Sequence, residues 1–289
     1  MSFHDFYFTS QEGLRLYARD YGSRASKKTP ILCLPGLTRN SKDFAALAEH
    51  LSTDRRVLCP DFRGRGKSDY APGWTDYTPI AEMRDTFDLM AAAGIEHAIL
   101  IGTSRGGIVA MNMGAHRPTA IKAVIMNDVG PEVDMAGITR IMGYAGTMEA
   151  PASWDEAATT LRQMNDRYFP NMPGEKWHAF AHMTFKDEEG CPAMDYDPAI
   201  GVGLRRAAKL LRGNVPVMWK EFNTLTHIPL LLVRGENSDL LSKRTVEKMQ
   251  SAHPAMELVT AKDRGHAPFL DEPEVTTAID GFLSRLGKH

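Results

Sequence analysis

Several features that mark special classes of protein are missing from this sequence of 289 residues. Only three cysteines are present, an odd number, and Cys33 and Cys59 fall in apolar runs. This usage predicts reduced thiols in a cytoplasmic protein without a disulfide framework. No apolar run reaches the ~18 residues that a membrane-spanning helix requires. The first residues lack a basic segment followed by an apolar one, so no secretory signal is expected.

A second group of absences concerns binding partners. The formal net charge is only -2 and charged residues make up 24% of the chain, so the electrostatic footprint of a nucleic-acid-binding protein is absent. Cysteines and histidines do not cluster at metal-ligand spacing, and no glycine-rich phosphate loop that ends in Gly-Lys is present. We therefore expect neither nucleic acid nor a membrane as a partner, and no metal or cofactor.

The segment 102–106, with the sequence Gly-Thr-Ser-Arg-Gly, gives the first indication of chemistry. It follows the apolar run 98–101 and precedes the helical pattern 107–113. A serine on a sharp turn between a strand and a helix presents its hydroxyl above the edge of the sheet, and flanking glycines let the backbone pass close to it. The first N–H groups of the helix point at the same place, where negative charge would be stabilised. This context favours Ser104 as a nucleophile over an ordinary helix cap.

A base and an acid are expected later in the chain, in loops that follow strands. His266 lies in such a loop after the apolar segment 256–259, where it can hang over the carboxyl edge of the sheet. Asp239 follows the strand-like segment 228–233, and one helix and one strand separate it from His266, as in a single crossover unit. Asp128, at the end of an earlier strand, is the rival acid. We favour Asp239 because of the single crossover.

Ser104, Asp239 and His266 occur in the nucleophile, acid and base order of the α/β-hydrolases, and the sequence resembles that family over nearly its whole length. Segment 30–37 is similar to the strand and loop that supply part of the family's oxyanion hole, and segment 61–69 is similar to the loop after the next strand. The resemblance implies that Ser104 is the nucleophile, His266 the base and Asp239 the acid.

The same resemblance implies an oxyanion hole formed by the backbone N–H groups of Leu37 and Arg105. Only one glycine is present at Pro35-Gly36, which argues against the lipase-type branch with the pattern His-Gly-Gly-Gly. We expect the side chain of Arg105 to point away from the site and to pair with an acid, because charged side chains leave a core unless they are paired.

The pattern of strands and helices predicts an α/β fold with a mostly parallel sheet of the eight-stranded type, helices on both faces and an inserted helical cap. Strand-like and helical patterns alternate up to about residue 132 and again from residue 222, which indicates a parallel sheet. Residues 1–132 and 222–289 are therefore assigned to the core. Residues 133–221 are assigned to the cap, with helices expected at 137–147, 154–168, 175–185 and near 199–211.

The expected activity is hydrolysis of a small-molecule carboxylic ester or lactone through an acyl-enzyme. The alternative is hydrolysis of a carbon–carbon bond in a β-diketone-like substrate with the same three residues, but relatives of that kind often carry a small or apolar residue where Arg105 follows the serine. Eight methionines lie in the cap or at its edges, and methionine fills irregular apolar space. We expect most of them to form the core of the cap and a minority to line a substrate cavity.

Overall fold

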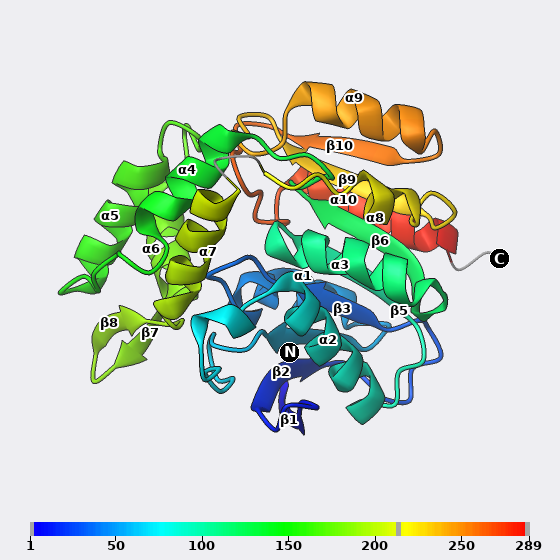
Figure 1. Ribbon diagram of the computed structural model, residues 1–289, viewed down its shortest axis with the longest axis horizontal. Helices are drawn as coiled ribbons and strands as arrows, with labels where there is room; N and C mark the ends of the chain where they lie inside the picture. The colour runs from blue at the N-terminus through cyan, green and yellow to red at the C-terminus, as the bar shows by residue number, and fades with distance from the viewer. Residues whose placement is uncertain (1–2, 212–214, 287–289) are drawn as a thin grey trace.

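A computed structural model describes residues 3–211 and 215–286 of the chain. Its centre is an eight-stranded sheet with the order β1-β2-β4-β3-β5-β6-β9-β10. The first two strands pair antiparallel with their neighbours, and the other strands are parallel to one another. Figure 1 shows this sheet with helices packed on both faces and further helices grouped to one side. The predicted fold class is confirmed.

The strands lie close to their predicted positions. Their bounds are β1 His4–Thr9, β2 Arg15–Tyr21, β3 Ile31–Leu34, β4 Val57–Asp61, β5 Ala98–Thr103, β6 Ile121–Asn127, β9 Leu230–Gly235 and β10 Glu257–Ala261. The parallel strands are apolar along their length because both of their faces are covered. On β5, Ala98 and Leu100 pack into the core on one side of the sheet, and Ile99 and Ile101 pack into the core on the other side.

Helices cover both faces of the sheet. One face packs against α2 (Pro79–Ala92), α3 (Arg105–His116), α8 (Trp219–Asn223) and α9 (Lys243–Ala252). The other face packs against α1 (Ala45–Leu51) and α10 (Pro273–Leu286). Each parallel crossover thus buries the apolar stripe of its helix on the sheet, which brings the carboxyl ends of the central strands to one common edge. No helix in the described part of the chain is both long and apolar enough to cross a membrane.

The segment from α4 to α7, between β6 and β9, forms a separate layer next to that edge (Figure 1). It contains α4 (Met135–Tyr144), α5 (Trp154–Asn165), α6 (Gly174–Thr184) and α7 (Ala199–Leu210). Its own apolar cluster includes Leu161, Trp177 and Phe185. The prediction of helices alone missed a short hairpin of β7 (Phe185–Glu188) and β8 (Cys191–Met194), which pair antiparallel. Both strands have only four residues, and three residues of β7 are charged. The sequence therefore lacks the apolar alternation that would have predicted the hairpin.

Candidate active site

Ser104 occupies the sharp turn between β5 and α3. Its backbone has φ 52° and ψ -111°. Residues other than glycine adopt such a positive φ only under local constraint. The N–H of Ser104 donates to the carbonyl of Asn127 on the adjacent strand β6, at 3.0 Å. The carbonyl of Ser104 accepts from the N–H groups of Gly107 and Ile108. These bonds over-determine the turn and hold the hydroxyl at the edge of the sheet.

The glycines around Ser104 are required by close backbone approach. A Cβ at Gly102 would lie 2.6 Å from backbone atoms of Gly106, and a Cβ at Gly106 would lie 2.0 Å from the carbonyl oxygen of Leu34. Both distances are far below van der Waals contact, so a side chain at either position would force α3 away from the strands. The two glycines therefore let the helix start directly above the sheet, with its N-terminus beside the serine.

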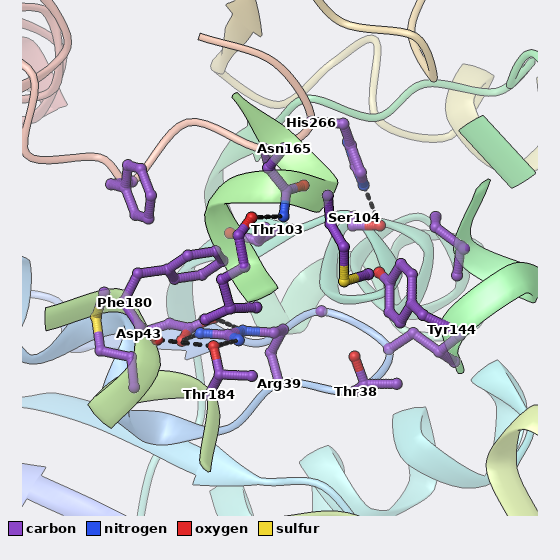
Figure 2. Close-up of a pocket in the computed structure, with 18 of the residues that line it drawn as sticks. Thr38, Arg39, Asp43, Thr103, Ser104, Tyr144, Asn165, Phe180, Thr184 and His266 are labelled. Carbon is purple, nitrogen blue, oxygen red and sulfur yellow. Dashed lines mark hydrogen bonds and ion pairs between the residues drawn. The ribbon is translucent and has the colours of Figure 1, made fainter. Parts of the chain in front are cut away.

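The structure brings His266 to Ser104. The His266 Nε2 lies 2.9 Å from the Ser104 Oγ, although 162 positions separate the two residues in the sequence. Figure 2 shows the imidazole and the hydroxyl meeting at one side of a pocket. The His266 side chain is only 7% exposed. The predicted contact between the candidate base and the candidate nucleophile is present.

The acid beside His266 is Asp128, so the prediction that Asp239 occupies this position is wrong. The His266 Nδ1 lies 2.8 Å from the Asp128 Oδ2. The Asp128 side chain is fully buried, and its carboxylate also accepts from the N–H of Gly235 at 2.8 Å and from the hydroxyl of Ser238 at 2.6 Å. With Asp128 accepting the Nδ1 proton, the Nε2 lone pair is free to accept the proton of Ser104.

Asp239 instead pairs with the cap. Its carboxylate accepts from Nε and Nη2 of Arg140 on α4, at 2.7 and 2.8 Å. Burial acts to raise the pKa of Asp239, but the hydrogen bonds and charge of Arg140 outweigh burial and hold that pKa below its ordinary value. The loop after β9 thus contributes to the site through Gly235 and Ser238, which orient Asp128, and not through its own carboxylate.

Two further residues support the site, and the sequence analysis missed both: Asn127 joins the nucleophile strand to the histidine loop, and Glu272 holds the histidine loop itself. The Asn127 Nδ2 donates to the hydroxyl of Thr103 beside the nucleophile and to the carbonyl of Pro268 in the histidine loop, at 3.1 and 2.9 Å. Glu272, which is buried, accepts from the backbone N–H groups of Phe269 and Leu270. For Asn127, the sequence offered one signal, because this asparagine ends a buried strand and directly precedes the rival acid Asp128.

The predicted oxyanion donors both lie near Ser104, since Leu37 lines the same pocket and Arg105 is the next residue along the chain. Leu37 belongs to the loop after β3, and Arg105 is the first residue of α3, where a backbone N–H has no preceding carbonyl in the helix. The Leu37 N–H makes no hydrogen bond to another group within the described residues. The Arg105 side chain points to Glu82, with 3.4 Å between Nε and Oε2. The predicted pairing of this side chain with an acid is confirmed.

Ser104 and His266 open into a pocket between the sheet edge and the cap (Figure 2). Its walls are mainly apolar and come from the loop after β3, from α4, α5 and α6, and from the histidine loop. The apolar lining residues include Phe44, Ile141, Met148, Leu161, Met164, Phe169, Phe180, Met183, Met194 and Phe269. Four of the eight cap methionines thus line the pocket, whereas Met172 lies in the core of the cap.

No group of three or more histidine, cysteine, aspartate or glutamate side chains that could hold a metal ion occurs within residues 3–211 and 215–286.

The sequence matches the family described as alpha/beta hydrolase fold over residues 29–273. The chain belongs to the α/β-hydrolase family. A crystal structure of an alpha/beta hydrolase from Novosphingobium aromaticivorans superposes on this α/β hydrolase with a TM-score of 0.89, at 42% identity and with 99% of each chain covered. That protein is therefore similar to this chain over both the core and the cap segment.

Curated relatives of this α/β hydrolase are similar over most of their length. The 3-hydroxybutyrate-oligomer hydrolase of Cupriavidus necator is 28% identical over 274 residues, which cover 93% of this chain and 92% of that protein. The 2-(acetamidomethylene)succinate hydrolase of Mesorhizobium japonicum is 25% identical over 255 residues, which cover 88% and 87%. Hydrolases of different substrates are thus similar to this chain, and its own substrate must be argued from its pocket.

Proposed function

We propose that this protein hydrolyses carboxylic esters, a class in which we include lactones, through an acyl-enzyme on Ser104. The observation that carries the proposal is the continuous hydrogen-bonded chain from the Ser104 Oγ through both ring nitrogens of His266 to the Asp128 carboxylate. A serine hydroxyl is a poor nucleophile at neutral pH and needs a base within hydrogen-bond reach. Here the base is at that distance and a buried carboxylate orients it.

The geometry supports a reaction in two halves. His266 takes the proton of Ser104 as the oxygen attacks the carbonyl carbon, and Asp128 stabilises the imidazolium that forms. The N–H groups of Leu37 and Arg105 donate to the negative charge that develops on the carbonyl oxygen. His266 then gives its proton to the leaving alcohol. Water, activated by the same imidazole, releases the acid and restores the serine.

The assignment of Asp128 replaces Asp239 in this mechanism. Asp128 directly follows β6, the strand next to the nucleophile strand β5, and β6 and β9 are themselves neighbours in the sheet. Either strand end can therefore reach the imidazole, and the deciding observation is which carboxylate contacts Nδ1. The relatives named as hydrolases, among them the 3-hydroxybutyrate-oligomer hydrolase, support hydrolytic chemistry.

A panel of acyl esters and lactones tests the proposal. We expect turnover of p-nitrophenyl esters of short acyl chains, with an initial burst where deacylation is slower than acylation, and loss of turnover in Ser104→Ala. Hydrolysis of a β-diketone with no activity on any ester would favour the carbon–carbon reaction instead. Undiminished ester turnover by Ser104→Ala would contradict both.

A further inference from the structure

Two arginines line the mainly apolar pocket, and their hydrogen-bonding states differ. Arg39 follows the oxyanion loop and donates from Nε and Nη2 to Asp43 and from Nη1 to Thr184, so each of its nitrogens has a protein acceptor (Figure 2). Asp43 is the only carboxylate among the described residues that line the pocket. Arg39 is therefore a structural group whose charge is matched locally.

Arg140 is only partly satisfied. Its Nε and Nη2 bond to Asp239, and its guanidinium carbon lies 4.9 Å from the centre of the Tyr168 ring. Its Nη1 donates no hydrogen bond within the described residues, yet Nη1 is not among the solvent-inaccessible atoms that lack a partner. Because Arg140 lines the pocket and its side chain is 18% exposed, this nitrogen offers two N–H donors to the pocket or its mouth.

The position of Arg140 relates it to the reaction. Asp239, to which it is bonded, directly follows Ser238, whose hydroxyl donates to the Asp128 carboxylate that contacts His266. His266 is also the group that protonates the leaving alcohol. Arg140 thus stands on the histidine side of the nucleophile, where the alcohol portion of an ester would lie.

We propose that Arg140 forms a carboxylate-binding subsite, so that the preferred substrates are esters whose alcohol portion carries a free carboxylate. This inference rests on the proposed ester hydrolysis. Asp239 holds the guanidinium in a fixed orientation, which reduces the conformational entropy lost when a ligand binds. Hydrogen bonds to charged groups in a partly buried site change affinity by about tenfold to hundredfold.

A matched pair of substrates tests the subsite. The anion 3-acetoxybutanoate and its methyl ester share the acetyl group and the scissile bond, and both are followed by acetate release. We expect the native enzyme to prefer the anion in kcat/KM, mainly through KM. The double variant Arg140→Met with Asp239→Asn, which leaves no unpaired carboxylate, should reduce this preference at least tenfold. Arg167→Met is the matched control, because Arg167 lies over the same Tyr168 ring but is exposed and outside the pocket lining.

A binding measurement separates failure of the subsite from failure of the ester proposal. Calorimetric titration of Ser104→Ala with 3-hydroxybutanoate requires no turnover. We expect the dissociation constant to rise at least tenfold when the Arg140→Met and Asp239→Asn changes are added. Equal binding with and without Arg140, or an equal loss in Arg167→Met, would overturn the subsite whatever the outcome of the hydrolysis assays.

A second inference, which also rests on the proposed ester hydrolysis, comes from a buried ion cluster that is connected to both predicted oxyanion donors. The side chains of Arg65 and Glu82 are fully buried, and that of Arg105 is 14% exposed. Glu82 lies 2.8 Å from the Arg65 Nη2 through one carboxylate oxygen and 3.4 Å from the Arg105 Nε through the other. Among the described residues, neither carboxylate oxygen has a hydrogen-bond partner beyond these ion pairs.

This cluster is connected to both oxyanion donors. The Arg65 Nε donates to the carbonyl of Leu37 at 2.8 Å, and Arg105 supplies the second predicted N–H from its own backbone. Glu82 is thus the common partner of the arginine that holds the Leu37 loop and of the arginine that follows the nucleophile. Burying three charges costs free energy, and apolar side chains could fill the same space without that cost. Stability alone therefore does not account for the cluster.

We infer that Glu82 is a positioning residue that sets the spacing between the N–H groups of Leu37 and Arg105. Oxyanion stabilisation depends on donors placed within a few tenths of an ångström of their optimal position, so relaxation of either loop weakens it. Since Arg65, Glu82 and Arg105 do not line the pocket, substrate binding in the ground state should depend on them much less than the transition state does.

The variant Glu82→Gln tests this role. We expect kcat to fall about tenfold to hundredfold with little change in KM. Affinity for butylboronic acid, whose serine adduct places an oxygen in the oxyanion hole, should fall in parallel. The control is Asp85→Asn, which weakens the buried pair of Asp85 with Arg63 on the same helix. Arg105→Gln provides the same test if Glu82→Gln does not fold. Unchanged boronate affinity in Glu82→Gln and Arg105→Gln, or an equal loss of boronate affinity in Asp85→Asn, would refute the inference.

Discussion

The exchange of Asp128 for asparagine tests the most specific feature of the site. The N–H of Gly235 donates to the Asp128 Oδ1, so this N–H group requires an acceptor at that position. An asparagine at this position therefore keeps its carbonyl oxygen toward Gly235 and turns its NH₂ group toward His266. The NH₂ group would donate to Nδ1, which forces the imidazole proton onto Nε2. His266 then cannot accept the proton of Ser104.

The magnitude follows from that tautomer. A triad aspartate exchanged for asparagine costs about 10⁴-fold in kcat, or about 5.5 kcal/mol of barrier. We expect a loss of this order in Asp128→Asn, with KM little changed. Hydrolysis of an uncharged p-nitrophenyl ester should fall less than about tenfold in Asp239→Asn, whose carboxylate contacts Arg140 rather than the imidazole.

The assay is steady-state hydrolysis of a p-nitrophenyl ester by the native protein and both variants, with circular dichroism and thermal melting as controls for folding. A larger loss in Asp239→Asn than in Asp128→Asn would refute the assignment. The double variant Asp128→Asn with Asp239→Asn should lose no more kcat than the two single losses multiplied together. This is expected because only one carboxylate acts on His266.

Three other predictions follow from the same contacts. His266→Ala should lower kcat nearly as far as Ser104→Ala, and the double variant should add little, because triad losses are not additive; ester hydrolysis measures this. Gly106→Ala should destabilise the fold by at least ~3 kcal/mol in urea unfolding, since its Cβ would meet the Leu34 carbonyl at 2.0 Å, whereas Gly143→Ala has open space and should not destabilise. The pKa of Asp239 is below its ordinary value of 3.8 in the folded state. Any extra stability of the native protein relative to Asp239→Asn should therefore be present at pH 7 and disappear as the pH falls through the folded pKa. Melting curves of both proteins across that range measure this, and a stability difference that grows in acid would contradict it.

The parts of the site that could be predicted from the sequence were those with local signals. The turn at Ser104 is specified by its own glycines and by the strand and helix on either side of it. His266 stands out because its loop follows a strand and precedes a helix. The sheet was predictable because buried parallel strands are short continuous apolar runs separated by helical patterns.

The acid could not be assigned by the same reasoning. Asp128 and Asp239 both follow strands, and those strands, β6 and β9, are neighbours whose carboxyl ends lie at one edge. Which carboxylate meets His266 depends on long-range contacts, namely the bonds from Gly235 and Ser238 to Asp128 and from Arg140 to Asp239. Neither set is visible in local sequence spacing.

Covalent trapping provides the most direct test of the central claim that His266 and Asp128 make Ser104 a nucleophile. The protein is incubated with a fluorophosphonate, digested and analysed by mass spectrometry, and the labelling rate is compared among the native protein, His266→Ala and Asp128→Asn. We predict a single adduct on the peptide that contains Ser104, formed much more slowly in both variants. An adduct on another residue, or labelling of Ser104 at the same rate without the imidazole, would contradict the account.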